Sequence, residues 1–579
     1  MKRYISLLLA LLLMVGLLAG CGNTEEKPST EPSTSTTTNP TQAPDDGNDP
    51  TDEPEDDFPL PLTEDEVTFD YWLPNSMTFE GYSGSEDSEF YKWMEQQTGV
   101  HINFINPPSS GVTEAFQTMV LSEDYPDFIY RIFSYYSGGV DKAISDGVIL
   151  RLNDYAEQYM PHYMAVVNRD EDTFIQSVSD SGNLWGVHCI LDRQQGAWIG
   201  TGIREDWLTD AGMTVKDVET VDGLEQALTA FKDYTYENQG PLFLSTGSAT
   251  YSGSITGTWN VMGVSQMPFL SIDGTATYNG MNPNYKEYVG KMADWYSKGL
   301  VNKNYVGENH WATPDDYWIN GNVGVADVMY ASMGMLTSMN ASSDFGADPD
   351  FTITAIPTPK LNASDDIWND YHCRESFNVV RAQNSVGIST QCSDIELACK
   401  WWDYIFTDEG TIASNWGPYV GELGDTSSSY YIDETDANGD GHVEVYQPWM
   451  MEKYGTCVYF MGLYTIHNGP QVYIWDREFT ALSQKEVDSA NTWDSVGTGW
   501  LWPDGVTLTA DEGSEASGIV AACNTAVNEW AVKVITGEKN VDTYDTELVP
   551  QLKTIGIERA TELYQNALSR YYDRAQFMD

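Results

Sequence analysis

The sequence predicts an α/β protein, because segments with the two-residue period of strands alternate with segments that have the period of helices. Residues 67–71 alternate apolar and polar side chains like a half-buried strand, and residues 100–104 repeat this pattern. Between them a helix is predicted over residues 89–97, with Ser88 as its N-cap and Gly99 as the residue that ends it. A strand, a helix and a strand at this spacing form a βαβ unit, which predicts a parallel sheet.

The same two patterns continue along the chain. Short apolar runs at residues 128–129 and 323–328 are typical of buried strands. Trp402 falls on the inner face of a predicted helix, so we expect it to pack in the core. Apolar residues at helical spacing predict helices within four further segments, residues 224–231, 289–296, 395–405 and 557–571.

The first twenty residues have the features of a signal peptide. Lys2 and Arg3 form a short positive region, and the apolar stretch that begins at residue 7 is too short for a comfortable membrane span. It ends in two small residues before Cys21, as in a lipobox, so we expect Cys21 to be lipidated and to become the new N-terminus. The alternative is an ordinary secretory signal followed by a chance cysteine.

Residues 21–65 are predicted to form the lipidated cysteine and a disordered tether. This segment is rich in Thr, Ser and Pro and then in Asp, Glu and Pro. Such a composition buries too little apolar surface to offset the entropy of the chain. No later stretch is apolar enough to span a bilayer, so we expect lipid alone to anchor the protein to the outer face of the cytoplasmic membrane.

The composition limits the size and the possible function of the folded part of the chain. The chain has 579 residues, 41% of them hydrophobic, which is enough for a large core and for two or more domains. The formal net charge of −58 argues against nucleic-acid binding, which needs basic patches.

Six cysteines follow Cys21, and an even number in an exported protein permits disulfides. The apolar neighbours of Cys399 and the small residues around Cys523 favour mostly buried thiols instead. Zinc is not expected, because no histidine has ligand spacing with the cysteines. The six are Cys189, Cys373, Cys392, Cys399, Cys457 and Cys523.

Several short motifs occur in a fixed order behind the lipobox. They are EFYKWMEQQTGV at residues 89–100, YPD at 125–127, AISDGVILRLND at 143–154, GIREDWLTDAGM at 202–213, the helix at 220–231, WYSKGLV at 295–301 and ITGE at 535–538. Each motif alone is weak, and their order is the strong signal. From about residue 66 to its end, the chain resembles extracellular solute-binding proteins of family 1, in the lipoprotein branch found in sugar importers.

This resemblance implies a two-lobed periplasmic-binding-protein fold of type II, with the ligand in a cleft between two α/β lobes. The first lobe is expected to comprise residues 66–190 and 376–430, and the second residues 191–375 and 431–579. The resemblance further implies a monomer without catalytic activity or a required cofactor. It would bind a carbohydrate, such as an oligosaccharide, and deliver it to the permease of an ABC transporter.

Candidate ligand-binding residues follow from sugar chemistry. Sugar rings present C–H faces that pack on aromatic rings, and their hydroxyls need carboxylate, amide or arginine partners. Ligands of open α/β sheets bind beyond the carboxyl ends of strands. Residues of these types near predicted strand ends, near lobe crossings or in and after loop segments are Trp72, Asn75, Tyr130, Arg131, Trp198, Trp259, Asn260, Asp327, Tyr330, Arg374, Glu375, Trp416 and Tyr419.

A segment near residue 440 resembles the first half of an EF-hand loop, which indicates a possible calcium site. The oxygens would come from Asp436, Asn438, Asp440, the carbonyl of His442, and Glu444. The twelfth position is glutamine instead of the usual glutamate, and the flanking residues alternate like strands. The alternative is a β-hairpin with an Asn-Gly turn.

Two other functions stay open at this stage. A secreted glycoside hydrolase would also be acidic and rich in tryptophan, but it needs a pair of carboxylates across the scissile bond, which sequence alone cannot reveal. A binder of peptides or of another small polar solute is compatible with the same fold, because a fold does not fix a function.

Overall fold

The computed structural model describes residues 60–74, 79, 82–236, 239–245, 255–265, 267–308, 315–341, 348–374, 378–435, 443–454 and 457–578. The chain divides into two units, Met1–Glu53 and Pro54–Asp579, and all described residues belong to the second. The predicted signal peptide, Cys21 and the predicted tether up to residue 59 lie outside the described residues.

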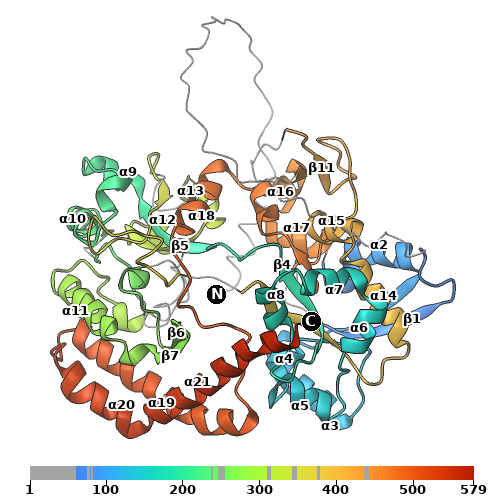
Figure 1. Cartoon of the computed structure of the whole chain (residues 1–579). Coiled ribbons are helices and arrows are strands. Elements are labelled where there is room, and N and C mark those ends of the chain that lie inside the picture. The colour runs from blue at the N-terminus through green and yellow to red at the C-terminus, as the bar shows by residue number, and fades with distance from the viewer. Residues whose placement is uncertain are drawn as a thin grey trace, which may run out of the picture. The chain divides into compact units, whose positions relative to one another are not determined.

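The larger sheet has six strands in the spatial order β13-β4-β10-β3-β1-β2. β1 pairs in parallel with β2 and with β3, which confirms the predicted βαβ unit, whereas β10 runs antiparallel to its neighbours β3 and β4. The strands, of which β1 and β4 are labelled in Figure 1, are β1 (Val67–Trp72), β2 (Val100–Ile105), β3 (Phe128–Tyr130), β4 (Val187–Leu191), β10 (Val380–Ile388) and β13 (Gln471–Tyr473).

The crossover helix α2 (Glu89–Thr98) has the predicted ends. Ser88 is its N-cap, and Gly99 has a φ of 75°, the left-handed conformation that glycine adopts without a Cβ clash. Two hydrophobic clusters pack against the sheet, and Trp402 is fully buried in one of them, as expected. Their other helices are α3 (Val112–Ser122), α4 (Ile132–Tyr135), α5 (Gly139–Ser145), α6 (Asn153–Tyr159), α7 (Pro161–Val167), α8 (Glu171–Ser177) and α14 (Ile395–Tyr404).

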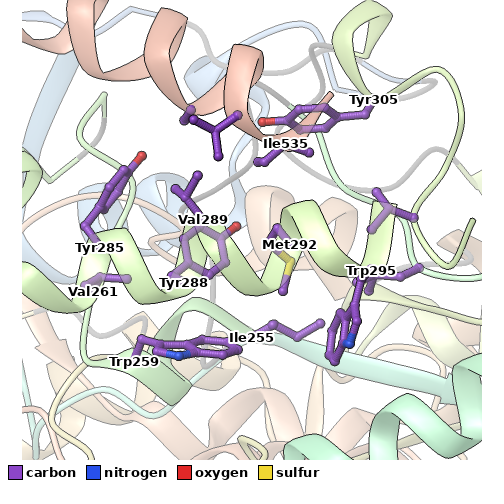
Figure 2. Packing of buried hydrophobic residues seen from close by; sticks show 14 of the residues in the cluster. Ile255, Trp259, Val261, Tyr285, Tyr288, Val289, Met292, Trp295, Tyr305 and Ile535 are labelled. Carbon is purple, nitrogen blue, oxygen red and sulfur yellow. The ribbon is translucent and has the colours of Figure 1, made fainter. Parts of the chain in front are cut away.

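The second sheet has three strands, with β5 (Ile199–Arg204) between β8 (Val325–Met329) and β9 (Ile353–Ala355) and antiparallel to both. A large hydrophobic cluster beside it includes the predicted helix α10 (Val221–Phe231) and helix α11 (Pro283–Ser297). Figure 2 shows one part of this cluster, where Trp259 and Ile255 lie beside the α11 residues Tyr288, Met292 and Trp295.

The remaining elements pack around the second sheet or form a separate hydrophobic cluster, which we call the outer cluster. Helices that contribute to the cores around the second sheet are α9 (Glu205–Asp210), α12 (Asp315–Ile319), α13 (Ser332–Ala341), α18 (Gln484–Trp493), α19 (Ala510–Ile535) and α20 (Val549–Ile555). A hairpin is formed by β6 (Phe269–Ile272) and β7 (Thr275–Tyr278). The outer cluster takes residues from α15 (Asp408–Trp416), α16 (Pro448–Tyr454), α17 (Cys457–Tyr464), β11 (Tyr430–Ile432) and β12 (Glu444–Tyr446).

The chain connects the two sheets more than once. It leaves the larger sheet after β4, returns to it with β10, and leaves it again after β13 for α18, which packs on β5 and β9. The last helix, α21 (Ile557–Asp573; red in Figure 1), begins in the core of the second sheet with Ile557 and ends with Tyr571 in the core of the first. β13 is a strand of the larger sheet, although it lies beyond residue 431, where the second lobe was predicted to resume. The lobe boundaries stay a prediction.

The six cysteines from Cys189 to Cys523 are free thiols. Five are buried and Cys392 is half-buried, so the prediction of mostly buried thiols is confirmed. Among the described residues, no helix combines the length and the apolar character needed to cross a membrane.

Candidate functional site

A cavity of about 420 Å³, which we call the central cavity, lies between the two sheets. From the larger sheet it takes residues at the ends of β3 and β13 and in the middle of β10, and from the second sheet residues just before β5 and just after β8. Its lining residues are Arg131, Phe133, Gln195, Trp198, Tyr330, Arg381, Ala382, Gln383, Asn384, Val458, His467, Asn468, Tyr473, Trp475, Glu478 and Asp504.

A second cavity of about 240 Å³, the side cavity, lies beyond the carboxyl ends of β1 and β3. Three residues, Arg131, His467 and Asn468, line both cavities and form the wall between them. Its other lining residues are Leu73, Pro74, Tyr82, Ser85, Ser88, Tyr91, Val112, Tyr130, Tyr135, Gly462, Thr465 and Ile466.

Arg131 stands at this wall in an unusual backbone conformation. Its φ of 58° is in the left-handed region, which costs a non-glycine residue on the order of 1 kcal/mol or more. The backbone holds it there, because its N–H donates to the carbonyl of Ser385 at 3.0 Å and its carbonyl accepts from the N–H of Ser134 at 2.9 Å. Strain of this kind, retained at the end of a strand beside a cavity, points to a functional position.

A β-bulge brings the second arginine into the central cavity. The pairing of β10 with β4 shifts register between Arg381 and Val386, and residues 381–384 line the cavity as a result. Arg381 donates to the side-chain oxygen of Gln195, and its guanidinium lies 4.3 Å from the centre of the Tyr473 ring. Across the bulge, Asn384 accepts a hydrogen bond of 3.1 Å from the Tyr130 hydroxyl.

Glu478 joins the two sheets at one side of the central cavity. One of its carboxylate oxygens accepts from the hydroxyl of Tyr330, which follows β8, at 2.8 Å, and the other from the hydroxyl of Tyr473 in β13 at 2.6 Å. Burial, and then the Glu478 carboxylate, raise the pKa of the Tyr330 hydroxyl well above its usual range. Both tyrosines therefore stay protonated and hold Glu478 as a hydrogen-bond acceptor.

His467, in the shared wall, is a neutral imidazole at pH 7. Burial, and then the charges of Arg477 and Arg381, lower the pKa of His467 to about 4. Its Nδ1 is buried and has no hydrogen-bond partner among the described residues. A buried polar atom of this kind is costly unless a ligand or water satisfies it.

Aromatic faces complete the central cavity. Trp198 is half-buried, and its carbonyl accepts a 3.2 Å hydrogen bond from the N–H of Tyr330. Trp475 and Tyr473 are almost completely buried. Aromatic faces combined with amides, hydroxyls and arginines suit a ligand that has apolar C–H faces and many hydroxyl groups.

The structure brings together some of the residues predicted for the site. Arg131, Trp198 and Tyr330 line the central cavity, and Tyr130 and Arg131 line the side cavity. Asp327 lines a separate cavity of about 40 Å³ next to the second sheet. We keep these residues as ligand-binding candidates.

Three predicted tryptophans lie in cores instead of the cavities. Trp259 is 4% exposed in the cluster shown in Figure 2, and Trp416 is fully buried in the outer cluster. Trp72 packs edge-on against the rings of Phe116 and Tyr135. A ring enclosed by core residues has no free face for a ligand, so we leave these three out of the proposed site.

Three further predicted residues have local structural contacts. Asn260 forms a turn with a φ of 52°, and its side-chain oxygen accepts from the N–H of His372 at 2.6 Å. Arg374 is buried and lies 3.3 Å from the carboxylate of Asp494. The hydroxyl of Tyr419 donates to Glu89 at 3.4 Å. Asn75 and Glu375 lie outside the described residues.

The proposed calcium loop is described at its ends alone. Strands β11 and β12 pair antiparallel, with Ile432 opposite Glu444, so the predicted flanking strands are present. Asp436, Asn438, Asp440 and His442 lie outside the described residues. Among the described residues, no group of three or more His, Cys, Asp or Glu side chains is placed to hold a metal ion.

Sequence reasoning missed several cavity residues. Arg381 and Asn384 reach the cavity through a bulge, and His467 lies in a loop, so no periodic pattern marks them. Glu478 is one of 87 acidic residues, and only the aromatic residues near it set it apart. The run Tyr473, Trp475 and Glu478 near a short strand carried a weak signal of the type used for the other candidates.

The chain is similar to known solute-binding proteins of ABC transporters. No protein-family model matches the chain. The fructooligosaccharide ABC transporter substrate-binding protein FusA of Streptococcus pneumoniae serotype 4 is 22% identical over 347 residues, which are 56% of this chain and 59% of FusA. The aligned part of the chain thus spans less than two thirds of that relative.

Solved structures of three solute-binding proteins share the fold over nearly their whole length. S. pneumoniae FusA in complex with kestose has a TM-score of 0.62 at 18% sequence identity. The match covers 88% of this chain and 99% of FusA. The alginate-binding protein AlgQ2 has a TM-score of 0.61 at 19% identity with the same coverage. An HMO-binding, ABC-transporter-associated protein from Bifidobacterium longum infantis has a TM-score of 0.63 at 14% sequence identity. The match covers 87% of this chain and 99% of that protein.

These likenesses confirm the predicted fold. The chain has the two-lobed α/β fold of the solute-binding proteins of ABC transporters, and the cavity between its two sheets occupies the place predicted for the ligand cleft. The relative and the three structures are named as binding proteins, none as an enzyme.

Proposed function

We propose that this chain is an extracellular solute-binding protein that binds an oligosaccharide and delivers it to an ABC transporter. The observation that carries the proposal is the central cavity between the two sheets, where aromatic faces stand beside amide, hydroxyl and arginine groups. The names of its relatives support a saccharide ligand, since FusA is named for fructooligosaccharides and AlgQ2 for alginate.

Different lining residues would make different kinds of contact with the ligand. The half-buried face of Trp198 would pack on a sugar ring, while Arg381 and Asn384 would bond its hydroxyl groups. Tyr330 and Tyr473 are held in place by Glu478, which keeps this side of the cavity ordered before the ligand arrives. A site ordered in advance loses less entropy on binding.

Ligand binding would also produce the signal for transport. A ligand in the central cavity contacts both sheets, so it stabilises the closed arrangement of the lobes relative to the open one. A permease that recognises the closed form can then distinguish a loaded protein from an empty one. We propose that the protein does this as a monomer and without catalysis.

We place the protein on the outer face of the cytoplasmic membrane, held by a lipid on Cys21. The features that support this are the positive region, the short apolar stretch and the small residues before Cys21. In cells that express the chain, Cys21→Ala should move the protein from the membrane fraction to the medium. Retention of that variant on the membrane would exclude lipid anchoring through Cys21.

Calcium binding by residues 436–444 stays a prediction, supported by the run of Asp436, Asn438 and Asp440. No part of the proposed saccharide site depends on it. If the loop holds calcium, a chelator should lower the melting temperature of the wild-type protein and leave that of Asp436→Asn combined with Asp440→Asn unchanged.

A thermal-shift screen tests the proposed function. The mature chain, with Cys21→Ser so that it carries no lipid, is heated with neutral and acidic oligosaccharides, monosaccharides and short peptides. Binding to the folded state should raise the melting temperature with at least one class of oligosaccharide. A shift with peptides alone would replace the saccharide with a peptide ligand, and cleavage of a bound sugar during long incubation would make the protein an enzyme.

A further inference from the structure

The side cavity departs from the charge balance of the rest of the chain. The sequence contains 87 acidic and 29 basic residues, a ratio of three to one. Yet none of the described residues that line the side cavity is acidic, and one of them is Arg131. In the adjoining central cavity, the carboxylate of Glu478 has both oxygens engaged by tyrosine hydroxyls, and Asp504 is an exposed side chain.

Arg131 has no carboxylate within ion-pair distance among the described residues, and its Nε is buried without a hydrogen-bond partner there. The neighbours of its guanidinium are the side chains of Tyr130 and Tyr135. Other arginines of the chain do contact carboxylates; they include Arg193, Arg204, Arg374, Arg559, Arg570 and Arg574. Arg131 therefore has a charge and a donor available for a ligand.

Two more buried polar atoms on the lining residues have no partner among the described residues. They are the hydroxyl of Ser88, whose residue is 2% exposed, and Nδ1 of His467. Ser88 is also the N-cap of α2, a ten-residue helix, and makes no side-chain capping bond. The free N–H groups of a helix N-terminus favour an anion. A guanidinium, a hydroxyl, an imidazole and a helix N-terminus together form a set suited to an anionic oxygen group.

We infer that the side cavity binds the anionic group of an acidic sugar residue, a carboxylate or a sulfate, while the neighbouring residues of the same oligosaccharide occupy the central cavity. This inference rests on the proposed function, because it assigns the class of saccharide to that site. The shared wall explains how one ligand reaches both cavities, since Arg131, His467 and Asn468 face each of them.

Matched ligands test the inference on the unaltered mature protein. Calorimetry compares oligogalacturonides of two to four residues with their carboxyl-reduced counterparts, which have the same length and linkage and no charge. Sulfated oligosaccharides with their desulfated forms make the second pair. We expect the charged member of at least one pair to bind at least tenfold more tightly, and the pair that responds identifies the anion. Equal affinity within both pairs, or tighter binding of the neutral members, overturns the inference but leaves the proposed function intact. If no saccharide binds, both fail.

Variants locate the anion. Arg131→Gln should weaken binding of the charged ligand by about tenfold to a hundredfold, the range of one charge-assisted hydrogen bond, and change binding of its neutral counterpart much less. Arg131→Lys, which keeps the charge and loses Nε, should fall between wild type and Arg131→Gln. Arg151→Gln is the control, because Arg151 is an exposed arginine beside Asp154, away from both cavities. Equal losses for both ligands in Arg131→Gln, with the melting temperature unchanged, would assign Arg131 a role other than charge recognition.

Discussion

Trp198 and Trp259 carry the same indole ring in different surroundings. Trp198 is half-buried at the central cavity, whereas Trp259 is 4% exposed inside the cluster of Figure 2. Trp198→Ala should therefore weaken saccharide binding by about 1–3 kcal/mol, the scale of one aromatic contact. Trp259→Ala should instead lower the free energy of unfolding by about 3–5 kcal/mol, as a large truncation in a core does.

Calorimetry with a bound saccharide and chemical denaturation of both variants distinguish these effects. The two tryptophans serve as controls for each other. Unchanged affinity in Trp198→Ala would remove this ring from the proposed site. A stable Trp259→Ala protein with reduced affinity would restore Trp259 as the ligand platform that the sequence suggested.

His188 gives the stability of the protein a dependence on pH. It is fully buried, its Nε2 lies 2.8 Å from the carbonyl of Ser177 and its Nδ1 lies 2.8 Å from the hydroxyl of Ser385. Burial lowers the pKa of His188 to about 4 from an unfolded value of about 6.5. Above pH 6.5 both states are neutral. Between pH 6.5 and 4 the unfolded state alone takes up the proton, so stability falls by about 3 kcal/mol as the pH drops through this window.

Denaturation midpoints between pH 7 and 4 measure this effect. His188→Asn loses the titrating group, so its stability should fall less steeply with acid than that of wild type, even if it is lower at pH 7. His101→Asn is the control, because His101 is exposed at the surface. Identical slopes for wild type and His188→Asn would show that His188 titrates normally in the folded protein.

The predictable part of the site consists of residues next to strands. Arg131 and Tyr330 follow short apolar runs that the sequence identifies as strands, and ligands gather at such ends. His467 and Arg381 could not be found in this way. Their position depends on a loop and on a bulge in β10, and both form through pairing with segments far away in the chain.

Two arginines at the end of α21 form ion pairs with one carboxylate, that of Asp180, which lies between α8 and β4 of the larger sheet. Asp180 accepts from Arg570 at 2.9 Å and from Arg574, which follows α21 and is 2% exposed, at 2.6 Å. Asp180→Ala leaves Arg574 buried without its carboxylate, so the free energy of unfolding should fall by about 3 kcal/mol. Chemical denaturation measures the loss.

The same helix supplies a control for that prediction. Arg559 pairs with Glu515 at 2.8 Å, and both side chains are 46% exposed. Because water screens an exposed ion pair, Glu515→Ala should lower the free energy of unfolding much less than Asp180→Ala does. Similar losses for the two variants would mean that burial of Arg574 does not govern its contribution.

Helices long enough to show a repeating apolar face could be predicted from the sequence. Short strands whose place depends on pairing with a distant segment could not. Helices α2, α10, α14 and α21 show an apolar face in the sequence, and the structure has them at the predicted places. β13 has three residues and was not predicted. Its place in the sheet comes from parallel pairing with β4, almost 300 residues earlier, and so short a strand carries no pattern of its own.

At the scale of the whole molecule, α21 has a bearing on how the two lobes move. Ile557 packs in the core of the second sheet and Tyr571 in the core of the first, so one helix is part of both lobes. A rigid helix shared in this way restricts closure to motions that bend the chain near its ends or turn the lobes about it. On ligand binding we therefore expect the lobes to close by bending of the few segments that cross between them. Neither core should repack.

Small-angle X-ray scattering tests this expectation. A saccharide that contacts both sheets favours the closed arrangement, so the radius of gyration of the mature protein should decrease when that saccharide is bound. Asp180→Ala, in which the end of α21 is less firmly held, should be larger than wild type without ligand and should shrink more on binding. Scattering that does not change with saturating ligand would mean that the free protein is already closed, and the permease would then have to recognise the ligand or a local change at the cavity instead of lobe closure.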